Sequence, residues 1–166
     1  MRRSGSVGFI VPRLACSGDV DTLAGRIQAT SEGVTGARMD YETVTPEAFG
    51  ASLRGIGLNI LVRDVPGMAD FLGAVFDMRA HRVSVDFAIM VYGEQVFQLH
   101  ADATYAANPL LGLLPEAGAR GAGAEFRLYD TDPDLAHERA RARGAHVLQD
   151  PMDKPHGLRE VFILCE

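Results

Sequence analysis

The clearest pattern of apolar and polar residues in this chain lies in residues 57–76, GLNILVRDVPGMADFLGAVF. Leu58, Ile60 and Val62 occupy alternate positions, which predicts a strand with two different faces. Pro66 follows and is compatible with the first turn of a helix. Apolar residues then recur at helical spacing at Met68, Phe71, Leu72, Val75 and Phe76. The segment therefore predicts a strand, a tight turn and an amphipathic helix that covers an apolar sheet face.

A second version of this pattern begins at residue 123. Residues 123–130, GAEFRLYD, match residues 57–64, GLNILVRD, in their first glycine, last aspartate and alternation. Asp132 and Pro133 then suit the N-cap and first turn of a second helix, and Gly144 suits its left-handed C-terminal cap. Two strand–helix units of one design indicate an internal duplication.

Further strands complete the first unit and extend the second. The hydrophobic pattern predicts them over residues 81–85, 87–92, 95–100, 145–148 and 160–165, with a hairpin turn at Gly93 and Glu94. The first unit therefore reads βαβββ. The second unit ends one strand earlier, either because the sequence is truncated there or because its sheet has one strand fewer.

These units divide the chain into four parts. They are an N-terminal extension (1–38), a first βαβββ module (39–102), a connection (103–122) and a second module that lacks its last strand (123–166). The extension contains only a thin helical pattern, over residues 19–33. The first module opens with a short helix that Thr45 and Pro46 can cap. The connection contains PLLGLLP at residues 109–115, which predicts a turn over the core, a lid or a subunit contact.

Composition narrows the classes of function. The chain has 166 residues, of which 47% are apolar, enough for an ordinary core. Its net charge of −6 argues against a nucleic-acid partner, which needs a basic face, and is compatible with a cationic ligand or a solvated acidic surface. No apolar run approaches the length of a membrane span. Because Cys16 and Cys165 suggest no disulfide framework, we expect a cytoplasmic protein with reduced thiols.

Two βαβββ units resemble the vicinal oxygen chelate superfamily, which includes glyoxalase I, bleomycin-resistance proteins and extradiol dioxygenases. Residues 155–160, PHGLRE, also match the P-[WH]-G-x-R-E stretch that often precedes the last strands of this family's C-terminal half. The resemblance covers about residues 50–166. It implies an α+β fold in which tandem βαβββ units form curved mixed sheets around a cup, with helices on the outer face, and it implies a homodimer.

In that fold, alternate strand positions face the cup, while Phe97, Leu99, Phe126 and Leu128 face the helices. The candidate ligand-binding residues are Asn59, Leu61, Gln98, His100, Glu125, Arg127, His156 and Arg159.

Several of these candidates have two interpretations. His100 is either a group for proton transfer or a histidine held at a strand end. Glu125 is either a general base or half of a structural pair with Arg127. The guanidinium of Arg159 either clamps an anionic substrate or holds the PHGLRE turn in place.

The resemblance also bears on metal binding. The metal enzymes of this family place ligands at the start of each half's first strand and in each half's last strand. The corresponding starts here are Gly57 and Gly123, which have no side chain, and the last strand of the first half offers only Gln98. We therefore expect no cofactor. The alternative is a divalent metal at a shifted site on His100 and Glu125, since imidazole and carboxylate suit such ions.

Three functions stay open at this stage. The first is a small-molecule-binding protein of the glyoxalase/bleomycin-resistance type without the usual metal site. The second is an enzyme, a lyase, isomerase or dioxygenase, with a non-standard metal site. The third is a partner-binding module whose cup is vestigial. A cavity favours the first, a bound metal the second, and a filled cup with exposed leucines the third.

Overall fold

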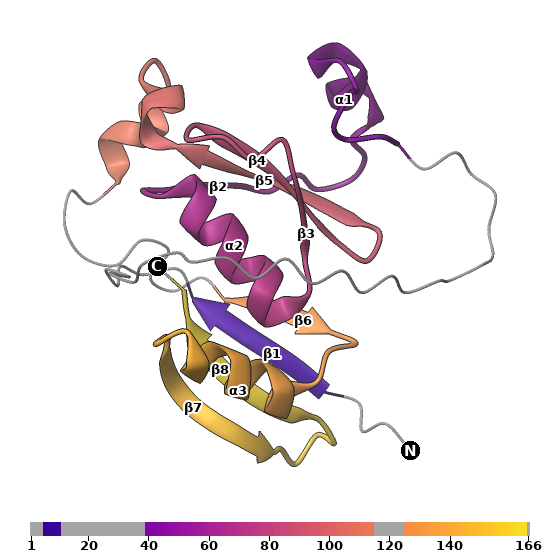
Figure 1. The fold of residues 1–166 in the computed structure, drawn as a ribbon, viewed down its shortest axis with the longest axis vertical. Helices are drawn as coiled ribbons and strands as arrows, with labels where there is room; N and C mark the ends of the chain where they lie inside the picture. The colour runs from indigo at the N-terminus through magenta and orange to yellow at the C-terminus, as the bar shows by residue number, and fades with distance from the viewer. Residues whose placement is uncertain (1–4, 11–38, 115–124, 166) are drawn as a thin grey trace.

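The computed structural model describes residues 5–10, 39–114 and 125–165, and it has an α+β fold built on two four-stranded mixed sheets (Figure 1). The first sheet has the order β2-β5-β4-β3, with strands Asn59–Val62, Gln95–Ala101, Phe87–Tyr92 and Arg79–His81. The second has the order β6-β1-β8-β7, with strands Phe126–Tyr129, Gly5–Ile10, Arg159–Leu164 and His146–Asp153. The predicted helix over residues 19–33 lies outside the described residues.

The helices begin where the sequence predicts. They are α1 (Pro46–Ser52), α2 (Val65–Phe76) and α3 (Pro133–Ala142), each with a proline in its first turn. An oxygen-bearing side chain caps each of them; the carboxylate of Asp64, for example, accepts a hydrogen bond from the amide of Gly67 at 3.0 Å. Gly144 follows α3 with a φ of 72°, the left-handed conformation that glycine adopts readily.

One core joins the two sheets. α2 and α3 pack against the sheet faces that carry Leu99 in the first sheet and Leu128 in the second. Phe97 and Phe126 pack against the same core, so the predicted alternation of these strands is confirmed. In Figure 1, α2 lies between the first sheet above and the second sheet with α3 below. Ion pairs from α3 to the α2 region, such as Arg139 to Asp77 at 2.7 Å, reinforce this contact.

The second sheet contains one strand that the sequence analysis did not predict. β1, which lies within the predicted extension 1–38, pairs antiparallel with β6 and parallel with β8. It takes the position that β5 has in the first sheet, although β5 runs parallel to β2 and antiparallel to β4. The second sheet therefore has four strands, and part of the N-terminal segment belongs to it.

Two strand boundaries also differ. The strand predicted over residues 81–85 is instead β3, Arg79–His81, because Arg82 adopts a φ of 51° and ends the strand. The Ser84 hydroxyl then accepts hydrogen bonds from the amides of Asp86 and Phe87, which forms a turn. β7 is longer than predicted because irregular pairing with β8 carries it on to Asp153.

The leucine-rich connection forms two short 3₁₀ helices, η1 (Asp102–Tyr105) and η2 (Pro109–Leu113). Leu113 is 81% exposed, so this leucine does not cover the core.

Candidate functional site

The cup face of the first sheet, the face turned away from α2, is partly covered by the chain itself. Phe49 of α1 packs with Ile89 and Val91 of β4 in a second, smaller core. The Glu42 carboxylate holds this covering segment to β3, since it lies 2.8 Å from the imidazole of His81. The part of the cup in front of β4 is therefore filled, as the partner-binding hypothesis expected for the whole cup.

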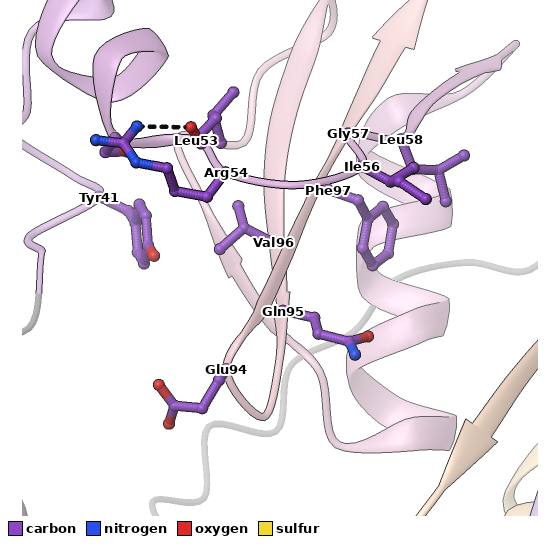
Figure 2. Close-up of a pocket in the computed structure, with 11 residues that line it drawn as sticks. Tyr41, Leu53, Arg54, Ile56, Gly57, Leu58, Glu94, Gln95, Val96 and Phe97 are labelled. Atoms are coloured by element: carbon purple, nitrogen blue, oxygen red, sulfur yellow. Dashed lines mark hydrogen bonds between the residues drawn. The ribbon is translucent and has the colours of Figure 1, made fainter.

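A cavity of about 540 Å³ lies at the end of the first sheet where β2 and β5 begin (Figure 2). The pairing of β2 with β5 starts only at Asn59 and Gln98, so the first residues of β5 project beyond β2. The chain leaving α1 passes along this edge and forms one wall of the cavity, which stays open to solvent. Its apolar walls are Leu53, Ile56, Leu58, Val96 and Phe97. Its polar walls include Tyr41, Arg54, Glu94 and Gln95.

Gly57 is part of the cavity wall. A Cβ atom built on this glycine would meet no heavy atom within 4 Å, so the space in front of it is open. By the resemblance described above, Gly57 is also the position where metal enzymes of the family carry a ligand. The cavity thus occupies the place where a first-strand metal ligand would stand.

His100 lies on the cup face of β5, opposite Leu61 of β2. Its ring stands edge-on to the rings of Phe87 and Tyr105, each with a centroid 5.1 Å away. Burial lowers the pKa of His100, and its Nε2 atom is buried without a hydrogen-bond partner among the described residues. Nδ1 is 3.4 Å from the hydroxyl of Thr104. His100 therefore packs between two aromatic rings, one residue before the end of β5.

The second sheet carries a charged cluster on its cup face. Arg127 lies 2.9 Å from the carboxylate of Glu125 and 2.6 Å from that of Glu160. His156 lies 3.0 Å from the same Glu160 carboxylate. Gly8 of β1 pairs with both Arg127 and Phe162, so no side chain separates these two residues, and the guanidinium stands 5.9 Å from the ring centroid. Glu125 and Arg127 thus form the pair that was one of their two predicted roles.

Arg159 faces the other way. It precedes Glu160 in β8, so its side chain lies on the opposite face of the sheet, on the side of α3. Its Nε and Nη2 atoms donate to both carboxylate oxygens of Asp134, at 2.7 and 2.8 Å, and Nη1 donates to Asp153. The guanidinium that was a candidate substrate clamp is therefore fully engaged in holding α3 to the second sheet.

The predicted site residues thus fall into separate groups. Asn59, Leu61, Gln98 and His100 share the first sheet, and Glu125, Arg127 and His156 share the second. In the described part of the chain, no group of three His, Cys, Asp or Glu side chains is placed to share a metal ion. Because His100 and Glu125 lie with different sheets and Glu125 is paired with Arg127, these residues do not fit the shifted metal site. Gly123 lies outside the described residues.

Comparison with known proteins gives structural similarity only. No protein-family model and no curated protein matches the sequence. A glyoxalase/bleomycin resistance protein/dioxygenase family enzyme from Burkholderia phytofirmans PsJN is 21% identical, with a TM-score of 0.49, over 65% of this chain and 94% of that one. Lactoylglutathione lyase from Agrobacterium tumefaciens is 15% identical, with a TM-score of 0.38, over 67% and 92%.

A glyoxalase/bleomycin resistance protein/dioxygenase from Nocardioides is 16% identical, with a TM-score of 0.40, over 70% of this chain and 89% of that one. Among the described residues, no helix is long and apolar enough to cross a membrane. The strand order and the shared core define the fold, which is α+β and resembles that of the glyoxalase/bleomycin-resistance/dioxygenase proteins.

Proposed function

We propose that this chain is a small-molecule-binding protein of the glyoxalase/bleomycin-resistance type that binds its ligand without a metal ion. The observation that carries the proposal is the cavity at Gly57, whose volume of about 540 Å³ falls in the range of small-molecule sites. Apolar walls with a few polar groups are also typical of such sites. The cavity lies beside the cup rather than in front of His100, because residues of α1 cover part of the cup.

The side chains available as metal ligands explain why we propose that the ligand binds without a metal ion. Gly57 supplies no ligand, and the carboxylates of the second sheet are already paired with Arg127. Ionised carboxylates in such pairs would have to give up a charged hydrogen bond to coordinate a metal. A homodimer and a cytoplasmic location remain predictions from the resemblance and the composition.

The direct test fills the cavity. Gly57→Phe places a ring in open space at a backbone position that requires no left-handed conformation, so the fold should persist. Gly112→Phe is the matched control, because Gly112 is equally open and lies outside the cavity wall. A library of small aromatic and aliphatic compounds would be screened by saturation-transfer NMR in the presence of EDTA. We expect compounds that bind the wild type to bind Gly112→Phe equally well and not to bind Gly57→Phe. Equal binding to both variants, or binding only after a divalent metal is added, would contradict the proposal.

A further inference from the structure

Arg54 is the cationic side chain of the cavity wall, and it is hydrogen-bonded to the end of α1. It follows α1, and its Nη1 atom donates to the carbonyl oxygens of Ala51 and Leu53, at 2.5 and 2.7 Å. In Figure 2 the guanidinium lies above Tyr41, with one of these hydrogen bonds drawn to Leu53. The last carbonyls of a helix attract cations, which accounts for this anchoring.

The anchoring leaves one edge of the guanidinium unused. An arginine has five N–H groups in a planar fork, and Nη1 supplies two of them. The Nε–H and one Nη2–H of Arg54 point in parallel along the adjacent edge. Within the described ranges, the hydrogen bonds of Arg54 are these two from Nη1, and no acidic residue forms an ion pair with it. Two parallel N–H groups on a charged fork match the two oxygens of a carboxylate.

Two large apolar residues of the cavity wall are exposed. Ile56 is 98% exposed and Leu53 is 37% exposed, which is unusual for large aliphatic side chains gathered at one cavity. Covering them would remove apolar surface from water. Glu94 is the other charged residue in the wall, and in Figure 2 it lies at the far end of the site from Arg54. A second negative charge on the ligand would be repelled at that end.

We infer that the ligand of this cavity is an amphipathic monocarboxylate, whose carboxylate binds the Nε/Nη2 edge of Arg54 and whose apolar body covers Leu53 and Ile56. The inference rests on the proposed function and adds the chemical class of the ligand. It differs from the cationic ligand with which the net charge of −6 is compatible. The guanidinium of Arg54 determines the chemical class of the ligand, because a bidentate hydrogen-bonded contact is stronger than the screened field of distant surface charges.

The test uses three probes that share one apolar body: 4-phenylbutyrate, 4-phenylbutan-1-ol and 4-phenylbutylamine. Their dissociation constants would be measured by NMR titration of the full chain in low salt. We expect the carboxylate to bind about 10-fold more tightly than the alcohol, as one partly exposed charge-assisted contact provides. Arg54→Gln should remove this preference while leaving the alcohol's affinity unchanged. Arg54→Lys should keep part of it, since lysine retains the charge but not the fork.

Arg79→Gln is the matched control, because it makes the same change in net charge on β3, outside the cavity wall. The inference is overturned if 4-phenylbutyrate does not bind at millimolar concentration, if the alcohol or amine binds as tightly, or if Arg79→Gln has the same effect as Arg54→Gln. The proposed function itself is contradicted by a different result, in which Gly57→Phe leaves the binding of every probe unchanged. The two failures are therefore distinguishable.

Discussion

Glu160 is the only charged residue that is buried in the part of the chain that the structure describes, with 2% of its surface exposed. Its carboxylate reaches across β1 to accept a hydrogen bond from Nη1 of Arg127, and Nε2 of His156 contacts the same carboxylate oxygen. Burial alone would raise the pKa of Glu160, but the hydrogen bonds from His156 and Arg127 outweigh it and hold the pKa below its ordinary value. This pair therefore links β6 to β8, and the buried carboxylate of Glu160 depends on the guanidinium of Arg127 to compensate its charge.

Replacing Arg127 with leucine should destabilise the protein mainly by leaving this carboxylate buried and poorly paired. Breaking a buried ion pair costs about 3–5 kcal/mol. The Arg127 side chain is 35% exposed, so water can partly replace it, and we expect a loss of about 2–3 kcal/mol at pH 7. In the wild type, the lowered pKa contributes stability above the unfolded value of about 4.3, and this contribution is lost as pH falls through the folded pKa. In Arg127→Leu the pKa of Glu160 rises, so the difference between the two proteins should shrink as pH falls from this raised pKa towards the lowered pKa of the wild type.

Urea denaturation of four proteins tests this explanation: the wild type, Arg127→Leu, Glu160→Gln and the double variant. The double variant should be more stable than the sum of the single losses predicts, by about 1 kcal/mol or more, because the unpaired charge is absent. Arg79→Leu, at an exposed strand position, serves as the control and should stay within about 0.5 kcal/mol of the wild type. Additive losses, or a loss in Arg127→Leu that is the same at pH 4 as at pH 7, would refute the reasoning.

Three further predictions concern the first module. Because burial lowers the pKa of His100, the unfolded chain takes up a proton more readily, so stability should fall as pH drops below about 6.5, and His100→Gln should remove this dependence in urea titrations. Phe49→Ala should cost about 3 kcal/mol in the same assay, since it empties the core that holds α1 on the cup. Asp64→Ala should cost about 1 kcal/mol by removing the cap of α2.

Local patterns in the sequence predicted most of the fold. Alternation located β4 and β5 to within one residue, and Pro66 and the Asp132 cap located the starts of α2 and α3. These elements succeed because their signals depend only on neighbouring residues, as strand alternation and helix capping do.

Long-range pairing and irregular segments could not be predicted in the same way. β1 joins the second sheet through partners more than 100 positions away, and nothing in residues 5–10 specifies them. Residues between α1 and β2 that have no periodicity form one wall of the cavity, so Arg54 was missed. One error was avoidable: the alternation of β8 places Arg159 on the same face as Val161 and Ile163, which is the core face.

The location of a bound probe tests the central claim most directly. Amide chemical shifts of the full chain would be followed by NMR as 4-phenylbutyrate is added in the presence of EDTA. We expect the perturbations to centre on Gly57, Leu58 and the start of β5, where the cavity lies. Perturbations that centre instead on His100 or Arg127, or that appear only after EDTA is replaced by a divalent metal, would contradict the claim.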